Sequence, residues 1–265
     1  MGAASESSLV EALPQWVTLL RAPNPGPMTL DGTNTWVLRA PGAEAAVVVD
    51  PGPLDEGHLA RIAGYGPFRY ILVTHGHPDH VEGAARLSEL LDGVPVLAAD
   101  PRHGGQLEHL SGHGLDIQLL KTPGHTADSV CFVVECAGER VVLTGDTILG
   151  RGTTVVAWPD GDLGAYLGSL EVLTAYENVL LLPGHGPALA DCAGTARVYL
   201  AHRQERLAQV RAAVAAGADS AEAVVDAVYP DIAPQVRFAA KWSARAQLEY
   251  LRRESHRPSE QLDPL

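Results

Sequence analysis

The sequence predicts an α/β protein with mixed β-sheets and a small helical appendage at the C-terminus. Three features support this fold class. Apolar segments of strand length open the chain with turn residues between them, and farther along such segments alternate with helical patterns. From about residue 196 only helical patterns remain. Because 46% of the 265 residues are hydrophobic, the chain can bury a sizeable core. We therefore divide it into a main domain, 1–195, and an appendage, 196–265.

The first third of the chain predicts a meander of strands. Apolar runs at 15–22, 35–40 and 45–52 indicate three strands, and the Gly/Pro-rich loop 23–34 separates the first two. A short helical pattern follows at 58–65. The run 70–75 predicts a buried strand, and 80–93 predicts one helix that begins near Asp79 or His80 and ends before Gly93.

The rest of the main domain continues this alternation, and the appendage is helical. The next strands are predicted at 94–100, 117–125, 129–138 and 139–146. A helix is predicted at 163–177, and a final strand follows it at 178–187. The polar, glycine-rich segment 102–114 is interpreted as a loop. Helices are expected at 198–217 and 237–254, with a proline-containing break between them at 228–236.

Charge and hydropathy restrict the possible partners. The net charge is −13, and residues 196–265, with ten Lys or Arg and nine Asp or Glu, leave about −14 on the main domain. Such an acidic domain disfavours long polyanions. No apolar run approaches the roughly 18 residues of a membrane span, so no membrane contact is expected. The N-terminal residues lack the basic and apolar regions of a secretory signal.

The cysteines indicate a reducing compartment. The chain has three, and Cys131 and Cys136 are five residues apart in one predicted strand, so they face opposite sides of the sheet. Free thiols in an odd number are typical of a reducing environment. We therefore expect a cytoplasmic protein.

Potential metal ligands recur where the predicted strands end. The stretch VTHGHPDHVEG, 73–83, crowds four of them into six positions, and single donors follow three other strands. The set is His75, His77, Asp79, His80, His125, Asp146 and His185. The histidines of the loop 102–114 are interpreted as solvated, and the remaining ones, among them His58, as core or surface histidines outside the site. Loops beyond strand ends carry function on a rigid support, so we expect these seven side chains to meet in one site.

The donor types indicate a dinuclear metal site. Zinc prefers histidine nitrogen and carboxylate oxygen, and seven donors are too many for one tetrahedral ion. Two ions about 3.5–4 Å apart can share a bridging hydroxide, a nucleophile available near neutral pH. His75 and His77 point to one ion from an extended turn, whereas Asp79 and His80 open a helix and face the other. Two Zn²⁺ are expected, and iron or manganese would suit these donors nearly as well.

Four motifs in this order, THGHPDH, TPGHT, TGD and PGHG, resemble the metallo-β-lactamase superfamily. The resemblance implies an αβ/βα sandwich and a dinuclear zinc hydrolase. It also implies that His75, His77 and His125 hold one ion, that Asp79, His80 and His185 hold the other, and that Asp146 bridges them. Asp50, in VVVDPGP, matches the aspartate that supports ligating histidines from outside the metal site.

Further roles are expected for residues near these motifs. Asp79 is our candidate to handle the proton, since it can orient the hydroxide while it binds metal, and Asp79→Ala and His77→Ala are expected to abolish turnover. Thr126 is expected to support the site from outside, with turn capping as the alternative. Arg151 is a candidate contact for an anionic substrate group, with an exposed loop arginine as the alternative. Asn34, in a loop that is either a flap over the metals or a structural turn, is a further candidate substrate contact.

The substrate is the least determined part of the prediction. NPGPMTLDGTNTWVL, GDTILGRGTTV and LPGHGPAL resemble the β-lactamase-like protein 2 group over nearly the whole chain. This group has a winged-helix-like tail, and its eukaryotic member is described as an endoribonuclease. Single-stranded RNA is therefore the first predicted substrate. A basic strip in the last helix agrees with it, although a solvated face or a homodimer surface would explain the same residues: Arg237, Lys241, Arg245, Arg252, Arg253 and Arg257.

Three alternatives stay open. Hydrolysis of a small-molecule thioester, as in glyoxalase II, uses the same ligand set, although those relatives usually read GHE where this chain has GHG and carry a different helical tail. Related ester or amide substrates belong to the same alternative. Dedicated β-lactamases of the superfamily generally lack the aspartate that Asp146 provides, so β-lactam hydrolysis is less expected. A metal-binding protein without turnover is the remaining alternative.

Overall fold

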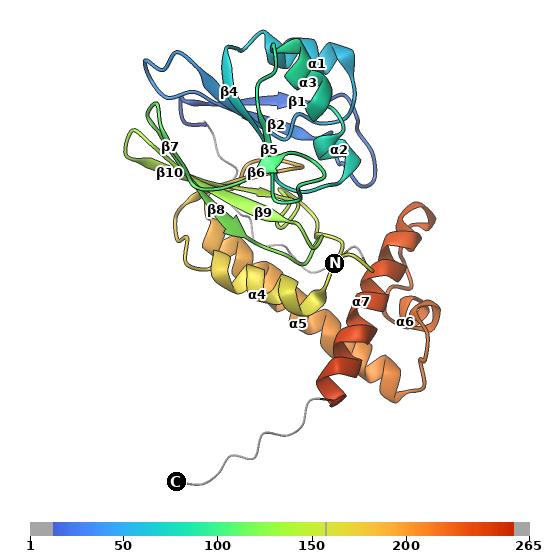
Figure 1. The fold of residues 1–265 in the computed structure, drawn as a ribbon. Helices are drawn as coiled ribbons and strands as arrows, with labels where there is room; N and C mark the ends of the chain where they lie inside the picture. Colours follow the sequence, from blue (N-terminus) through green and yellow to red (C-terminus); the bar gives the residue numbers. More distant parts are fainter. Residues whose placement is uncertain (1–12, 157, 257–265) are drawn as a thin grey trace, which may run out of the picture.

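Two β-sheets stacked face to face, with helices on both outer sides, form the main domain (Figure 1). The computed structural model describes residues 13–156 and 158–256. The layers are α1 to α3, the first sheet, the second sheet, and α4 with α5 (Figure 1). The expected αβ/βα sandwich with C-terminal helices is therefore confirmed.

The first sheet has six strands in sequential order, and it is mixed. β1 and β2 pair antiparallel, as do β2 and β3, whereas the later pairs are parallel. Its strands are β1 (Val17–Arg21), β2 (Asn34–Leu38), β3 (Ala46–Val49), β4 (Phe68–Val73), β5 (Val96–Ala98) and β6 (Gly105–Gln106). Parallel β3 and β4 therefore end at the same edge of the sheet.

The second sheet has five strands in the order β11-β10-β9-β8-β7. β10 and β11 are parallel and also end at a common edge, whereas the other pairs are antiparallel. The strands are β7 (Leu110–Gly112), β8 (Leu115–Lys121), β9 (Val130–Cys136), β10 (Glu139–Gly145) and β11 (Leu180–Pro183).

The helices cover the sheets and build the appendage. α1 to α3 lie on the first sheet, α4 and the first half of α5 lie on the second, and α6, the short 3-10 helix η1 and α7 complete the appendage. Their bounds are α1 (Glu56–Ala63), α2 (Pro78–Val81), α3 (Ala84–Leu90), α4 (Leu163–Leu173), α5 (Cys192–Ala215), α6 (Ala221–Val228), η1 (Pro234–Val236) and α7 (Arg237–His256).

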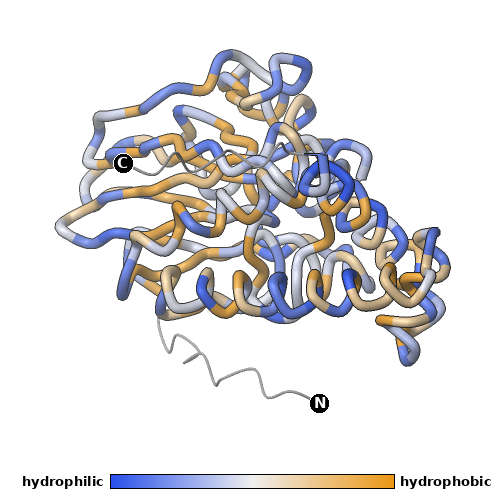
Figure 2. Tube along the Cα trace, turned by 90° about the horizontal axis from the view of Figure 1, so that it is seen from below, coloured by the Kyte–Doolittle hydropathy of each residue, from blue (hydrophilic) through white to orange (hydrophobic). Residues whose placement is uncertain are grey.

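Alternation along the strands divides the apolar side chains between separate cores. In β9, Phe132 and Val134 pack between the sheets, whereas Cys131 and Val133 pack against α4 and α5. Cys136 lies with the former pair, so the two cysteines of this strand face opposite sides, as predicted. The strands accordingly run orange through the middle of the molecule in Figure 2, and the hydrophilic turns lie at its margins. All three cysteines are buried free thiols.

Helix α5 belongs to two cores. Its first half places Cys192, Ala196 and Tyr199 on the second sheet. Its second half places Val210 among Val224 of α6 and residues of α7. The appendage is thus attached to the main domain through one continuous helix. Among the described helices, none is both long and apolar enough to cross a membrane.

Three expectations for the elements were wrong or incomplete. The single helix predicted at 80–93 is broken into α2 and α3 at Gly83, because its backbone N–H donates to the Gly52 carbonyl at 2.9 Å and a Cβ there would lie 2.8 Å from Leu59. Part of the loop 102–114 is strand β7, which forms a hairpin with β8 around a left-handed turn at 112–114. Helix α6, capped by the Ser220 side chain, was not predicted.

His58 is a core histidine outside the metal centre, one of the two positions expected for it. The side chain is 2% exposed, and it lies between Thr35 and Arg61. The Thr35 hydroxyl donates to the Asp50 carbonyl, so it accepts from His58 Nε2 at 2.9 Å, and Nδ1 accepts from Arg61. Burial and the Arg61 charge lower the pKa of His58 to about 4, which keeps the ring neutral near pH 7.

Candidate metal centre

All seven predicted donors come together at one edge of the sandwich. β4 leads directly into His75, β10 into Asp146 and β11 into His185, while His125 follows β8. The two sheets are joined at this edge by the Asn34 N–H, which donates to the Gly184 carbonyl at 2.8 Å. Parallel strands ending side by side therefore place donors from distant parts of the sequence within contact of one another.

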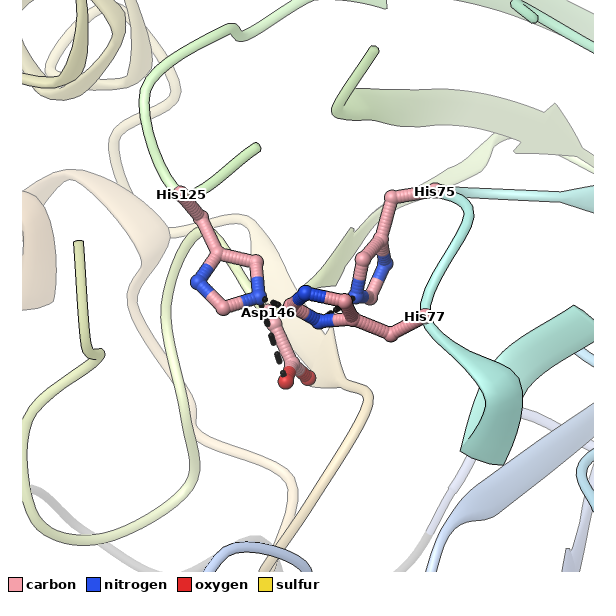
Figure 3. Close-up of side chains that lie close together, drawn as sticks. All are labelled: His75, His77, His125 and Asp146. Atoms are coloured by element: carbon pink, nitrogen blue, oxygen red, sulfur yellow. Dashed lines mark hydrogen bonds and ion pairs between the residues drawn. The ribbon is translucent and has the colours of Figure 1, made fainter. Parts of the chain in front are cut away.

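The first cluster consists of His75, His77, His125 and Asp146. The Nδ1 atom of His77 lies 3.1 Å from Nε2 of His75 and 3.1 Å from Nε2 of His125. Figure 3 shows His125 reaching in from one side and His75 and His77 from the other, with the Asp146 carboxylate between them. Three imidazole nitrogens thus converge on a single point.

The second cluster consists of Asp79, His80 and His185. The Nε2 atoms of the two histidines are 3.2 Å apart, and Asp79 Oδ2 lies 3.1 Å from that of His185. Both histidines are fully buried, whereas the Asp79 side chain is 27% exposed. Asp79 is therefore the member of this cluster that solvent reaches.

Asp146 lies between the clusters. Its Oδ2 is 3.7 Å from His125 Nε2 and 3.4 Å from His185 Nε2, and its Oδ1 is 3.4 Å from His80 Nε2. The carboxylate thus contacts histidines of both clusters, which is the geometry a bridging ligand requires.

Outer hydrogen bonds fix the orientation of four of the five rings. Nδ1 of His80 donates to Asp50 at 2.8 Å, and Nδ1 of His125 donates to the Val155 carbonyl at 2.6 Å. His75 Nδ1 lies 3.0 Å from the Thr74 hydroxyl, which itself donates to Asp50, and His185 Nδ1 lies 3.3 Å from the Gly32 carbonyl. With their protons outside, these rings direct Nε2 inward, as metal-ligating histidines do.

The side chains present fit two divalent metal ions. Burial lowers the pKa of His75, His77 and His125, the last to about 4, so all three rings are neutral near pH 7. The outer nitrogens of His75 and His125 are held by Thr74 and Val155, so both rings direct an Nε2 lone pair to within 3.1 Å of His77 Nδ1, an arrangement that a cation stabilises. Asp146 Oδ1 is also buried without a hydrogen-bond partner among the described residues. The donor set is therefore built for cations.

In the second cluster, carboxylates raise the pKa values of the histidines, whereas burial lowers those of the first cluster. Burial lowers the pKa of His80, but Asp146, Asp50 and Asp79 outweigh it and raise it well above 6.5. Burial is likewise outweighed at His185, where Asp146 and Asp79 raise the pKa to about 9. Burial raises the pKa of Asp79, but His80 and His185 lower it further, so the carboxyl is ionised at neutral pH.

This asymmetry predicts proton release when metal binds. At pH 7 the metal-free protein carries a proton on Nε2 of His80 and His185 but not on the inner nitrogens of the first cluster, so only the second ion displaces protons. Affinity at the second cluster should therefore fall as pH falls below about 9, whereas the first should tolerate acid better, because burial lowers the pKa of its three histidines. Calorimetric zinc titrations in buffers of different ionisation enthalpy measure the release. Heats independent of the buffer at both steps would contradict the assignment.

A cavity of about 390 Å³ opens from this centre toward the appendage. His125 and Asp146 line one end, and the loop residues Met28 and Leu30 form one wall. Helices α5 and α7 form the opposite wall, with Tyr229 and Ile232 between α6 and η1. Its volume lies in the range of about 300–1,000 Å³ that is typical of small-molecule sites.

The supporting residues agree only in part with the predictions. Asp50 lies where expected, and its carboxylate accepts from the Thr74 N–H and hydroxyl as well as from His80. Thr126 does not contact His125; its hydroxyl bonds to Asp128 and Ser129, so it orders its own turn, and the Val155 carbonyl supports His125 instead. The sequence could not predict the supporting roles of the Val155 and Gly32 carbonyls, because every residue supplies a backbone carbonyl.

The two predicted substrate contacts lie in different environments. Asn34 is fully buried, and its amide donates to the carbonyls of Pro183 and Gly186, so it holds the His185 loop instead of reaching the cavity. Arg151 lines the cavity mouth and pairs with Asp31, with one N–O distance of 2.8 Å. The side chains of this pair are about half exposed and link the 23–33 loop to the loop after β10.

The basic strip on α7 is largely paired with acidic side chains. Arg237 pairs with Asp226, Lys241 with Glu222, and Arg253 with Asp162 and Glu249. Arg252 lies 4.0 Å from Glu249, and the Arg245 guanidinium lies over the Trp158 ring. Arg257 is outside the described residues. The described part of the strip therefore presents little free positive charge.

Known proteins resemble the chain in sequence and in structure. The family model of the metallo-beta-lactamase superfamily matches residues 28–104 and 98–185. A beta-lactamase-like protein 2 homolog from Caenorhabditis elegans is 31% identical, over 91% of this chain and 86% of its own length. An atrochrysone carboxyl ACP thioesterase from Aspergillus chevalieri is 33% identical, over 77% and 68%. A metallo-beta-lactamase family protein from Thermus thermophilus superposes with a TM-score of 0.73 at 25% identity, covering 92% of this chain and 95% of that one.

Proposed function

Because the chain belongs to the metallo-β-lactamase superfamily and is a metal-dependent hydrolase, we propose that it hydrolyses a carboxylic thioester with a small, largely apolar acyl group. The cavity that joins His125 and Asp146 to an apolar wall carries this proposal. An acyl chain fits such a wall. The similarity to a relative named as a thioesterase supports the same reaction.

The residues of the centre divide the work of hydrolysis. Two divalent ions, held by the two clusters and shared by Asp146, would supply an activated water and a Lewis acid for the scissile carbonyl. Asp79, an ionised carboxylate that solvent reaches, holds and passes on the proton of the attacking water. The apolar wall orients the acyl group and excludes bulk water around the carbonyl. Thiolate is a good leaving group, so no separate strong acid is required.

Zinc is our proposal for both ions. The imidazole and carboxylate donors suit it, and they also suit iron or manganese. The buried free thiols support the proposal of a reducing, cytoplasmic location. A homodimer through the C-terminal helices stays a proposal, supported by the exposed and mutually packed Phe238 and Trp242 of α7.

Cleavage of single-stranded RNA is the second candidate. The relative that spans 91% of the chain favours it only through the group resemblance, because its name states no substrate. The pairing of the α7 cations with Asp226, Glu222 and Asp162 weakens the basic strip on which the RNA prediction depended. Thioester hydrolysis is therefore placed first.

The proposal predicts metal-dependent thioesterase activity. Zinc-loaded protein should hydrolyse a hexanoyl thioester of N-acetylcysteamine well above the spontaneous rate. It should hydrolyse the corresponding oxygen ester and amide more slowly, and it should leave end-labelled single-stranded RNA intact. Prolonged chelation should return the rate to background, and zinc, iron or manganese added back singly should show which ion restores it. RNA cleavage without thioester turnover, lost in Asp79→Asn, would reverse the order of the two candidates.

A further inference from the structure

The cavity wall formed by α5 carries positive charge inside an acidic protein. His202, Arg203 and Arg206 line it, and Arg151 lies at its mouth. Asp146 is the only carboxylate that lines it among the described residues, and it belongs to the metal centre. The whole chain has a net charge of −13, so the positive charge of this cavity wall is opposite in sign to that of the protein as a whole. A cavity of this charge attracts an anion.

Arg203 and Arg206 differ from the cations of α7 in having no carboxylate partner in the described part of the chain. Arg203 donates from Nη2 to the Thr154 carbonyl, and its guanidinium lies 5.1 Å from the Tyr166 ring centre. Arg206 uses only Nη1, toward Gln209 and the Val228 carbonyl, and lies 4.8 Å from the Tyr229 ring centre. Both guanidinium groups are held in place by neutral groups, so their charge remains available.

Two polar atoms in this wall are buried without a partner among the described residues, His202 Nδ1 and Arg203 Nε. Arg203 is 5% exposed, so its guanidinium pays the cost of burial without a counter-ion. Burial, Arg203 and Arg206 lower the pKa of His202, which leaves it a neutral hydrogen-bonding group. The uncompensated charge of Arg203 adds to the positive potential of the cavity, which an anion beside Arg206 would offset.

We propose that Arg206, with Arg203 and His202, forms an anion-binding subsite for a charged group of the substrate, remote from the scissile carbonyl. The anion is a carboxylate on the acyl group or a phosphate on the thiol, since a guanidinium binds both. The inference rests on the proposed thioester hydrolysis and defines its substrate class. Arg206 acts through binding, because it belongs to neither metal-ligand cluster.

Matched thioesters test the subsite. N-acetylcysteamine thioesters of hexanoate and adipate have equal acyl length and differ by one terminal carboxylate, while hexanoyl pantetheine and hexanoyl phosphopantetheine differ by one phosphate. Arg206→Gln removes the charge and Arg206→Lys keeps it. Arg211→Gln is the matched control, because Arg211 lies on the same helix, is exposed and pairs with Glu254 outside the cavity. Melting temperatures of all variants report any loss of folding.

One anionic thioester should have a KM about tenfold or more below that of its neutral partner, a preference that Arg206→Gln removes and Arg206→Lys partly keeps. Turnover numbers should change little, and Arg211→Gln should behave as wild type. The preferred pair identifies the anion as carboxylate or phosphate. Equal KM values within both pairs in the wild type, or an equal effect of Arg206→Gln on neutral and anionic thioesters, would overturn the subsite while leaving thioesterase activity intact.

If no thioester is hydrolysed, the proposed function fails and the subsite is tested by binding alone. Adipate and hexanoate each offer one carboxylate to the zinc ions, so calorimetry on zinc-loaded protein isolates the second carboxylate of adipate. Tighter binding of adipate that Arg206→Gln removes and Arg211→Gln keeps would support the subsite. Equal affinities, or a preference that Arg206→Gln leaves intact, would overturn it.

Discussion

Asp79→Asn is expected to lower the turnover number by about 10²–10⁴-fold, the contribution of a positioned proton acceptor. The side chain keeps its shape, but it loses the charge that now lies 3.1 Å from His185 Nε2 and 3.6 Å from His80 Nε2. Burial raises the pKa of Asp79 and the two histidines lower it further, so the wild-type group is an acceptor at neutral pH. An amide cannot accept a proton at that pH, so the loss should not be recovered between pH 6 and 9.

Metal content separates this effect from loss of an ion. The variant is assayed with excess zinc while bound metal is measured on the same sample, since Asp79 is also a candidate ligand of the second cluster. Asp116→Asn is the matched control, because the Asp116 side chain is 46% exposed and, within the described part of the chain, pairs only with His109. Wild-type turnover by an Asp79→Asn protein with two bound ions would remove Asp79 from the reaction.

Gly184→Ala is expected to damage the metal centre without touching a ligand. A Cβ at this position would lie 2.6 Å from Asp146 Oδ1 and 2.6 Å from His80 Cε1. The His80 ring is fully buried and bonded to Asp50, and the Asp146 side chain is only 11% exposed, so neither can yield without moving the inner nitrogens and oxygens. The added methyl should cost about 1–3 kcal/mol of stability. A displacement of this size should also lower turnover by about 10²-fold.

Gly168→Ala provides the same chemical change in an open position. Gly168 lies inside α4, and a Cβ there would meet nothing within 4 Å. Alanine in a helix interior should stabilise the protein by about 0.5–1 kcal/mol, with two ions retained and normal turnover. The measurements are bound zinc, chemical unfolding and turnover for both variants. If Gly184→Ala bound two ions and turned over like Gly168→Ala, the close approach of these side chains would be wrong.

The candidate ligands were predictable because the chain repeats one device. The donors lie in segments that follow apolar strands. Strands that end at one edge place these segments together whatever their separation in sequence, as His80 and His185 show with Nε2 atoms 3.2 Å apart. The supports of the ligands were predictable only where a side chain supplies them, as Asp50 does. Val155 and Gly32 act through backbone carbonyls, and Asn34 through loop carbonyls that only the folded chain brings near, so no residue type marks them.

The cavity was not predictable for a related reason. Its walls come from the 23–33 loop, the loop after β10, α5 and α7, which periodicity treats as separate surfaces. Spacing along α7 correctly grouped Arg237 and Lys241, but it gave no sign that acids of α6 neutralise them. Arg203 and Arg206, which give the cavity its positive charge, lie in α5. The sequence predicted this helix but not that these two side chains line a cavity.

Helix α5 also has a consequence for how such a protein changes over time. One half of it is fixed by the second sheet, next to the reacting centre, and the other half is the platform on which α6 and α7 rest. Substitutions in α6 and α7 can reshape the far wall of the cavity while the strands that bear the donors keep their positions. The segments that hold the metal donors and those that shape the far wall of the cavity can therefore change independently, while α5 keeps them in a fixed relative position.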